Sequence, residues 1–109
     1  MDIAIIGGGA AGFMAAITAR KTNTKANVTI FERASKVLAK VEVTGGGRCN
    51  VTNSFAAITD LKQAYPRGDK LMKRLFNVFD YKDTYRWFEQ HGVPLVTQED
   101  ECVFPKAQD

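Results

Sequence analysis

The sequence predicts an α/β fold that begins with a parallel βαβ unit, and three observations support this class. A continuous apolar run, DIAII, starts at residue 2, and a glycine-rich stretch follows it directly. An alanine-rich segment of helical composition comes next, and a second β-branched run, NVTIF, starts at residue 27. A strand, a helix and a strand in this order are typical of a right-handed crossover between parallel strands.

The first strand is expected at residues 2–6. Its run does not alternate between apolar and polar residues, so we expect both of its faces to be buried, as in a parallel sheet. The helix is expected at residues 10–22. Residues 27–31 are expected to form the second strand, which ends at Glu32.

The junction between the first strand and the helix carries a GxGxxG pattern, made by Gly7, Gly9 and Gly12, with Gly8 as an additional glycine. Glycine weakens both strands and helices, so a cluster at this point needs a reason. Glu32 stands at the end of the next strand, twenty positions after Gly12. This context predicts a dinucleotide-binding turn, and the alternative is a turn that serves only strand–helix packing.

Each glycine of the pattern has an expected role. Gly7 permits the tight turn, Gly9 lets a diphosphate approach the backbone, and Gly12 lets the helix pack closely on the strands. The amides of Ala10 and Ala11 would face the diphosphate at the positive end of the helix dipole.

The ribose of the same ligand is expected to meet the end of the second strand. Glu32 would accept hydrogen bonds from the ribose hydroxyls and repel a 2′-phosphate. Arg33 weakens the second expectation, since an arginine there could meet such a phosphate.

Residues 33–53 are expected to be loop, because the middle of this segment is polar and rich in glycine. Its TGGGRCN stretch, Thr44 to Asn50, could lie against the bound dinucleotide and place Arg48 near the negative charge of that ligand. A hinge or a plain turn is the alternative. Arg48 could also lower the thiol pKa of Cys49. Cys49 is interpreted as a residue that packs the loop or lines the cofactor, with redox catalysis as the alternative; the other cysteine, Cys102, is 53 positions away.

The second half of the chain is expected to contain two helices and a β-hairpin. A helix is predicted from Asp69 to about Phe79, and another from the N-cap Asp80 through His91, ended by Gly92. His91 is expected to interact with the last carbonyls of this helix. Tyr81, Tyr85 and Phe88 are spaced as a core-facing stripe, and residues 94–104 are expected to form two short strands around a polar turn.

Composition and charge limit the class of protein. The chain has 109 residues, 45% hydrophobic and 25% charged, which is typical of one soluble globular domain. The net charge of +3 is concentrated between Lys62 and Arg86. A solvated helical face explains this charge better than nucleic-acid contact, because no nucleic-acid motif accompanies it. We expect a cytoplasmic protein without a membrane partner, since no apolar run has membrane-spanning length, and no metal site, since the cysteines lack ligand spacing.

The GxGxxG pattern alone does not distinguish FAD from NAD; the second glycine cluster favours FAD, and a resemblance supports the same distinction. The GGGAAG stretch, Glu32, the KVEVTGGGRCNVTN block and the VFP stretch at Val103 together resemble the BaiN/YhiN-like family of bacterial flavoproteins, related to the aminoacetone oxidase-like enzymes. The resemblance implies noncovalently bound FAD on a Rossmann-like, glutathione-reductase-like fold, and an oxidoreductase with a small-molecule substrate and NAD(P)H as candidate electron donor. The matching cofactor-contact positions are Gly7, Gly9, Ala10, Ala11, Gly12, Glu32, Lys40, Gly45, Gly46, Gly47, Arg48, Cys49 and Asn50.

Members of the resembled family are longer, so residues 1–109 are expected to be the N-terminal part of an FAD/NAD(P)-binding domain, without the rest of the sheet and the substrate domain. Such a piece is expected to be inactive, and to be marginally stable or to self-associate, because a thin sheet leaves apolar surface and strand edges open. Two alternatives stay open. One is an NAD(P)-binding dehydrogenase or dinucleotide sensor, and the other is a noncatalytic interaction module that uses the basic helical region.

Overall fold

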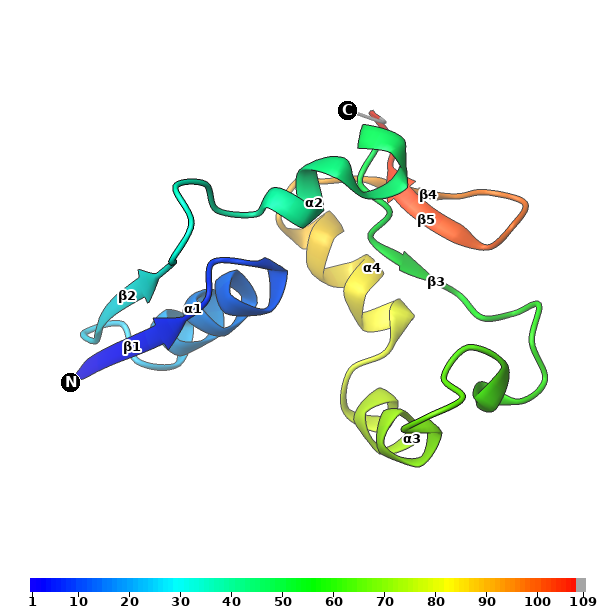
Figure 1. The fold of residues 1–109 in the computed structure, drawn as a ribbon, viewed down its shortest axis with the longest axis horizontal. Coiled ribbons are helices and arrows are strands. Elements are labelled where there is room, and N and C mark those ends of the chain that lie inside the picture. Colours follow the sequence, from blue (N-terminus) through cyan, green and yellow to red (C-terminus); the bar gives the residue numbers. More distant parts are fainter. Residues whose placement is uncertain (108–109) are drawn as a thin grey trace. The chain divides into compact units, whose positions relative to one another are not determined.

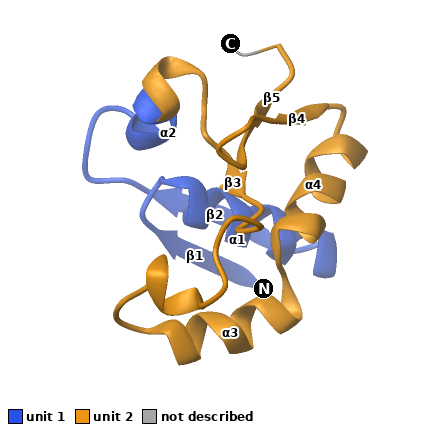
Figure 2. Cartoon of the chain, turned by 90° about the vertical axis from the view of Figure 1, so that its right-hand side faces the viewer, with its two compact units in different colours: residues 1–44 blue, residues 45–109 orange. Residues whose placement is uncertain are grey.

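The computed structural model describes residues 1–107 of the chain. These residues form two compact units, of which the first is Met1–Thr44 and the second begins at Gly45. Figure 1 shows the order of the helices and strands, and Figure 2 colours the two units separately. Each unit is built from elements that follow one another in the sequence.

The first unit contains the predicted βαβ arrangement. Strand β1 is Asp2–Ile6, helix α1 is Ala10–Thr22 and strand β2 is Asn27–Phe31. The two strands are parallel and in register from the pair Asp2 and Asn27 to the pair Ile6 and Phe31. The predicted α/β class, the bounds of these three elements and the strand direction are therefore confirmed.

The expectation that both faces of β1 are buried is wrong for the described residues. Ile3 and Ile5 are half-buried, and the Ile5 side chain points toward Gly12 of α1. Ala4 and Ile6 are exposed, with 83% of Ile6 accessible. Among the described residues this sheet has two strands and one helix packed against them, so only one of its faces is covered.

The sequence suggested that the segment after Glu32 is loop, but part of it is helical. It contains the short helix α2, Ala39–Val43, and a 3₁₀ turn, η1, Thr44–Gly47. The amide of Glu42 donates to the Leu38 carbonyl at 3.1 Å, and the Glu42 carboxylate forms an ion pair with Lys36. The β-branched residues Val41 and Val43 have weaker helix propensity, which is why the local pattern did not indicate this helix.

The second unit combines two helices with a small antiparallel sheet. Helix α3 is Asp69–Val78 and helix α4 is Tyr81–Gln90, and the 3₁₀ turn η2, Leu61–Gln63, precedes them. Strands β4, Leu95–Thr97, and β5, Cys102–Pro105, form the predicted hairpin. The sequence did not predict β3, Thr52–Asn53, which pairs with β5.

The core of the second unit lies on this sheet. Leu95, Val103 and Phe104 are buried, and Val103 is fully covered. The predicted stripe on α4 is half-buried, and the hydroxyl of Tyr85 lies 3.0 Å from the Thr97 hydroxyl of β4. Helix α4 therefore packs toward β4, as its apolar spacing indicated.

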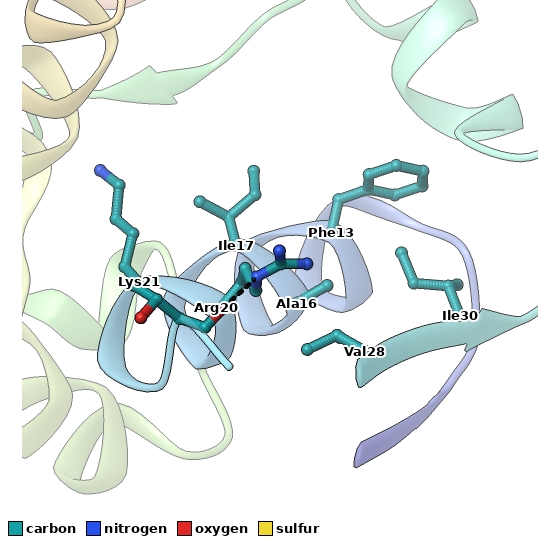
Figure 3. Close-up of a pocket in the computed structure, with 8 residues that line it drawn as sticks. Phe13, Ala16, Ile17, Arg20, Lys21, Val28 and Ile30 are labelled. Atoms are coloured by element: carbon teal, nitrogen blue, oxygen red, sulfur yellow. Dashed lines mark hydrogen bonds between the residues drawn. The ribbon is translucent and has the colours of Figure 1, made fainter. Parts of the chain in front are cut away.

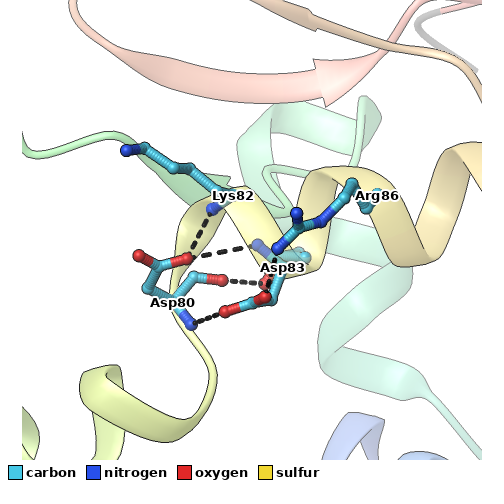
Figure 4. Close-up of polar contacts among 5 residues, drawn as sticks. Asp80, Lys82, Asp83 and Arg86 are labelled. Carbon is cyan, nitrogen blue, oxygen red and sulfur yellow. Dashed lines mark hydrogen bonds and ion pairs between the residues drawn. The ribbon is translucent and has the colours of Figure 1, made fainter.

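Helix α4 begins with the capping arrangement that the sequence predicts (Figure 4). The Asp80 carboxylate accepts hydrogen bonds from the amides of Lys82, at 2.9 Å, and Asp83, at 3.2 Å. In return the Asp83 carboxylate accepts from the Asp80 amide at 2.8 Å. This amide, and next the Arg86 guanidinium at 2.6 Å, hold the pKa of Asp83 below its ordinary value.

The other end of α4 is also as predicted. The Nδ1 atom of His91 lies 2.6 Å from the carbonyl oxygen of Trp87, so the imidazole interacts with the last turn. Gly92 follows with a φ of +82°, the left-handed conformation that commonly ends a helix.

Replacing the capping residue, Asp80→Ala, is expected to lower the free energy of unfolding by about 1 kcal/mol, because two amides of the first turn lose their acceptor. Urea denaturation of the purified chain measures the change. Asp60→Ala is the matched control, since Asp60 caps only the three-residue η2 by accepting from the Lys62 amide. An equal loss in the two variants would contradict the assignment.

Candidate functional site

The turn between β1 and α1 leaves the start of the helix open. The Gly7 amide donates to the Phe31 carbonyl at 2.8 Å and so ends the strand pair, and the first bond of α1 runs from the Phe13 amide to the Gly9 carbonyl at 3.1 Å. No side chain of the described residues caps α1 at Gly9. Gly9, Ala10 and Ala11 are exposed. The free amides of this first turn form an arrangement that suits an anion.

The glycines of this turn differ in what surrounds them. A Cβ on Gly12 would lie 1.9 Å from the Gly7 carbonyl oxygen, so close packing of helix on strand requires glycine there. A Cβ on Gly9 would meet nothing within 4 Å. The packing expected for Gly12 is thus present, and the backbone at Gly9 has the open space that a bound diphosphate needs. That Gly9 contacts a diphosphate stays a prediction.

Glu32 lies against this turn, as the sequence predicts. One oxygen of its carboxylate, Oε1, accepts from the Gly8 amide at 2.9 Å, and the other, Oε2, accepts from the Ala34 amide at 2.7 Å. The hydrogen bond from Ala34, and next that from Gly8, lower the pKa of the Glu32 carboxyl. Each oxygen retains acceptor capacity for a further donor. The neighbouring Arg33 is exposed.

The lowered pKa of Glu32 gives this contact a defined pH dependence. The stabilisation of the fold by the charged Glu32 carboxylate is fully present above the pKa that this carboxyl has in the unfolded chain. It is lost as the pH falls through the lower pKa of the same group in the folded chain. The carboxylate is therefore charged at neutral pH.

Lys40 belongs to the same unit. It lies in α2 and is exposed. The amide of Leu38, at the start of this helix, donates to the Gly8 carbonyl at 2.8 Å, so α2 is attached to the glycine turn. Its role as a cofactor contact stays a prediction.

The second glycine cluster belongs to the other unit. Gly45, Gly46 and Gly47 all have left-handed backbone, with φ of 62°, 68° and 88°. A Cβ on Gly45 would lie 2.6 Å from Cε1 of Phe104, whereas one on Gly46 or Gly47 would meet nothing within 4 Å. Packing therefore explains Gly45, and Gly46 and Gly47 present open backbone.

Arg48 packs within the same unit. Its Nε donates to the Gly45 carbonyl at 3.1 Å, and its guanidinium carbon lies 4.3 Å from the centre of the Phe104 ring. The TGGGRCN and VFP stretches are thus held together by one cation–π contact. The expected approach of this loop to the cofactor stays a prediction.

Cys49 and Asn50 complete the second loop. Cys49 has a φ of 63°, and burial raises the pKa of its thiol, so the suggestion that Arg48 lowers this pKa is wrong. Asn50 is exposed, and its Nδ2 lies 3.7 Å from the Cys102 sulfur. A protonated thiol is a poor nucleophile, so the structure favours the packing interpretation of Cys49 over the redox one.

In a Cys102→Ser background, Cys49 is expected to react with iodoacetamide more slowly at neutral pH in the folded chain than in urea. The reason is that the thiolate is the reacting form and the fold disfavours it. Alkylation rates as a function of pH, followed by mass spectrometry, measure the effect. A faster reaction in the folded chain would show that the thiol is activated.

An apolar groove runs along α1 and β2 (Figure 3). Phe13, Ile17, Val28 and Ile30 line it, and Arg20 at its rim donates from Nε to the Thr24 carbonyl at 3.1 Å. No residue of the predicted cofactor site lines this groove. Within residues 1–107, no cluster of three or more potential metal ligands occurs and no helix has the length and apolarity to cross a membrane.

The comparisons with known proteins agree with this geometry. Residues 1–109 match the family described as HI0933-like protein Rossmann domain. The chain is also similar to the 3-dehydro-bile acid delta(4,6)-reductase of Clostridium scindens, with 34% identity over 91 residues. The aligned part covers 84% of this chain and 22% of that relative.

Proposed function

We propose that this chain, which belongs to the family of HI0933-like Rossmann domains, binds the ADP half of FAD. It would supply this binding to a flavin-dependent oxidoreductase. The ligand would lie at the glycine turn of the first unit. The amides of Ala10 and Ala11 would bind the diphosphate, and the Glu32 carboxylate would bind the adenosine ribose.

One observation carries this proposal. A negatively charged acceptor, Glu32, is hydrogen-bonded to the Gly8 amide at 2.9 Å, immediately beside an uncapped helix start. The helix start attracts the diphosphate anion, and the carboxylate accepts hydrogen bonds from neutral hydroxyl groups. A nucleoside diphosphate carries a diphosphate anion and neutral hydroxyl groups on the same sugar. The side-by-side arrangement of these two sites therefore supports an ADP moiety.

FAD, when bound, supplies the electron transfer through its isoalloxazine ring. The chain's own residues would hold and orient it: open backbone at Gly9 admits the diphosphate, and Glu32 holds the sugar. We include the second loop, with Gly46, Gly47 and Arg48, as a contact to the flavin half. The relative named as a reductase supports an oxidoreductase with a small-molecule substrate. NAD(P)H is kept as the candidate electron donor of this proposal.

Titration of the purified chain with FAD, ADP and FMN tests the proposal. FAD and ADP are expected to bind and to compete with each other, whereas FMN, which lacks the adenosine half, is expected not to compete. Isothermal calorimetry measures all three. Competition by FMN as strong as that by ADP would overturn the assignment. NAD is titrated in the same way as an alternative ligand, and selective binding of NAD in place of FAD would favour a nicotinamide-dependent dehydrogenase.

We also propose that the chain associates with itself. Ile6 and Phe31, at the ends of β1 and β2, are 83% and 55% exposed, and within the described residues these strands pair only with each other. Open strand edges and apolar side chains favour association. Sedimentation velocity is expected to show species larger than the 12.0 kDa chain, with the fraction rising with concentration. A monomer at all concentrations would contradict this.

A further inference from the structure

Gly8 occupies a variable position of the GxGxxG pattern, yet it is the most enclosed residue of the glycine turn. It is buried, whereas Gly9, Ala10 and Ala11 are exposed. Its amide donates to Oε1 of Glu32 at 2.9 Å, and its carbonyl accepts from the Leu38 amide at 2.8 Å. Both backbone polar groups of this one residue are thus used to hold the segment that follows β2.

The space around Gly8 is also occupied. A Cβ at this position would lie 2.9 Å from Cγ1 of Val37, and 3.2 Å and 3.3 Å from the Cβ and Cγ of Glu32. The first distance requires a shift of a β-branched, stiff side chain. The other two require a shift of Glu32 itself. Any side chain at position 8 therefore presses on the stem of the side chain whose carboxylate the Gly8 amide binds.

We propose that Gly8 is the positioning residue of the nucleoside end of the site: it sets the Glu32 carboxylate at the angle that recognises the ribose 2′-hydroxyl. This inference rests on the proposed function. Gly8 itself contacts no part of the ligand in this proposal, and it acts through Glu32.

The orientation of Glu32 is fixed at both oxygens. Gly8 donates to Oε1 and Ala34 donates to Oε2, so the plane of the carboxylate is set by two backbone amides, one from the turn after β1 and one from the segment after β2. One further acceptor site per oxygen remains for the two neighbouring hydroxyls of a ribose. Hydrogen bonds weaken steeply with misalignment, so a tilt of the carboxylate costs hydroxyl recognition without changing the open amides of α1.

The test compares the affinities for ADP and 2′-deoxy-ADP, because only ADP carries the 2′-hydroxyl. The original chain is expected to bind ADP about tenfold more tightly or better, the difference that one hydrogen bond to a charged acceptor makes. Gly8→Ala is expected to reduce this ratio to near 1, and the loss of affinity for 2′-deoxy-ADP, which keeps the 3′-hydroxyl, is expected to be smaller than the loss for ADP. Gly9→Ala, the matched control, is expected to weaken both ligands equally and to keep the ratio.

A second variant separates positioning from folding. Val37→Ala added to Gly8→Ala removes the 2.9 Å contact but leaves the two contacts with Glu32. The double variant is expected to regain thermal stability and still to lack 2′-hydroxyl discrimination. A ratio restored together with stability would overturn the inference, as would an unchanged ratio in Gly8→Ala. If the original chain binds neither ADP nor 2′-deoxy-ADP, the proposed function fails instead.

Discussion

Gly12→Ala is expected to lower the free energy of unfolding by about 3 kcal/mol, the upper part of the range for overpacked sites. The new Cβ would lie 1.9 Å from the carbonyl oxygen of Gly7, and this neighbour is backbone that cannot rotate away. Alanine normally improves a helix by up to about 1 kcal/mol over glycine, so the clash has to exceed that gain. Urea denaturation followed by circular dichroism measures the difference.

Gly9→Ala is the matched control for this stability effect. Its Cβ would meet nothing within 4 Å, and the φ of −95° suits alanine. The expected change in the free energy of unfolding is less than about 1 kcal/mol, the size of an altered N-cap. A loss in Gly12→Ala that is no larger than in Gly9→Ala would mean that α1 can move away from β1. The close approach of helix and strand would then not explain the third glycine of the pattern.

The parts of the fold that the sequence predicts are those determined by local chemistry. The bounds of β1, α1 and β2 follow from an apolar run, a glycine turn and a β-branched run, and each signal lies within its own element. The same holds for α4, where Asp80 and Asp83 satisfy each other's amides three residues apart. Such short-range interactions leave a readable pattern.

The elements that the sequence missed depend on distant residues. Strand β3 has two residues and exists because Thr52 pairs with Val103, 51 positions away. Helix α2 starts from Leu38, whose amide binds the carbonyl of Gly8. The exposure of Ile6 depends on how many elements cover the sheet, which the composition of one strand does not reveal. These features required tertiary contacts that no local pattern contains.

The candidate site shows the same division. The spacing of GxGxxG and Glu32 predicted that the acidic side chain meets the turn, and the 2.9 Å hydrogen bond to Gly8 places it there. The sequence did not single out Gly8 or Val37, because their importance lies in contacts between the turn and residues 24 or more positions later. The raised pKa of Cys49 likewise follows from burial and not from its charged neighbour in sequence.

Glu32→Ala is expected to weaken ADP binding by roughly 10- to 100-fold, because hydroxyl groups lose a charged acceptor. The affinity for inorganic pyrophosphate, which carries no sugar, is expected to stay the same, since α1 and its open amides do not change. Calorimetric titration with both ligands measures the contrast. An equal loss for pyrophosphate would place Glu32 in the structure of the turn and not in sugar recognition.

Glu32→Gln is expected to change the choice of nucleotide as well as its affinity. Glutamine keeps the size of the side chain and an acceptor oxygen but removes the negative charge that repels a 2′-phosphate. The exposed Arg33 beside it can then pair with that phosphate. We expect the preference for ADP-ribose over its 2′-phosphorylated form to fall in Glu32→Gln, and to recover in part when Arg33→Ala is added. If the preference is unchanged in Glu32→Gln, the charge at the end of β2 does not read the 2′ position, and the ribose must be bound by other groups.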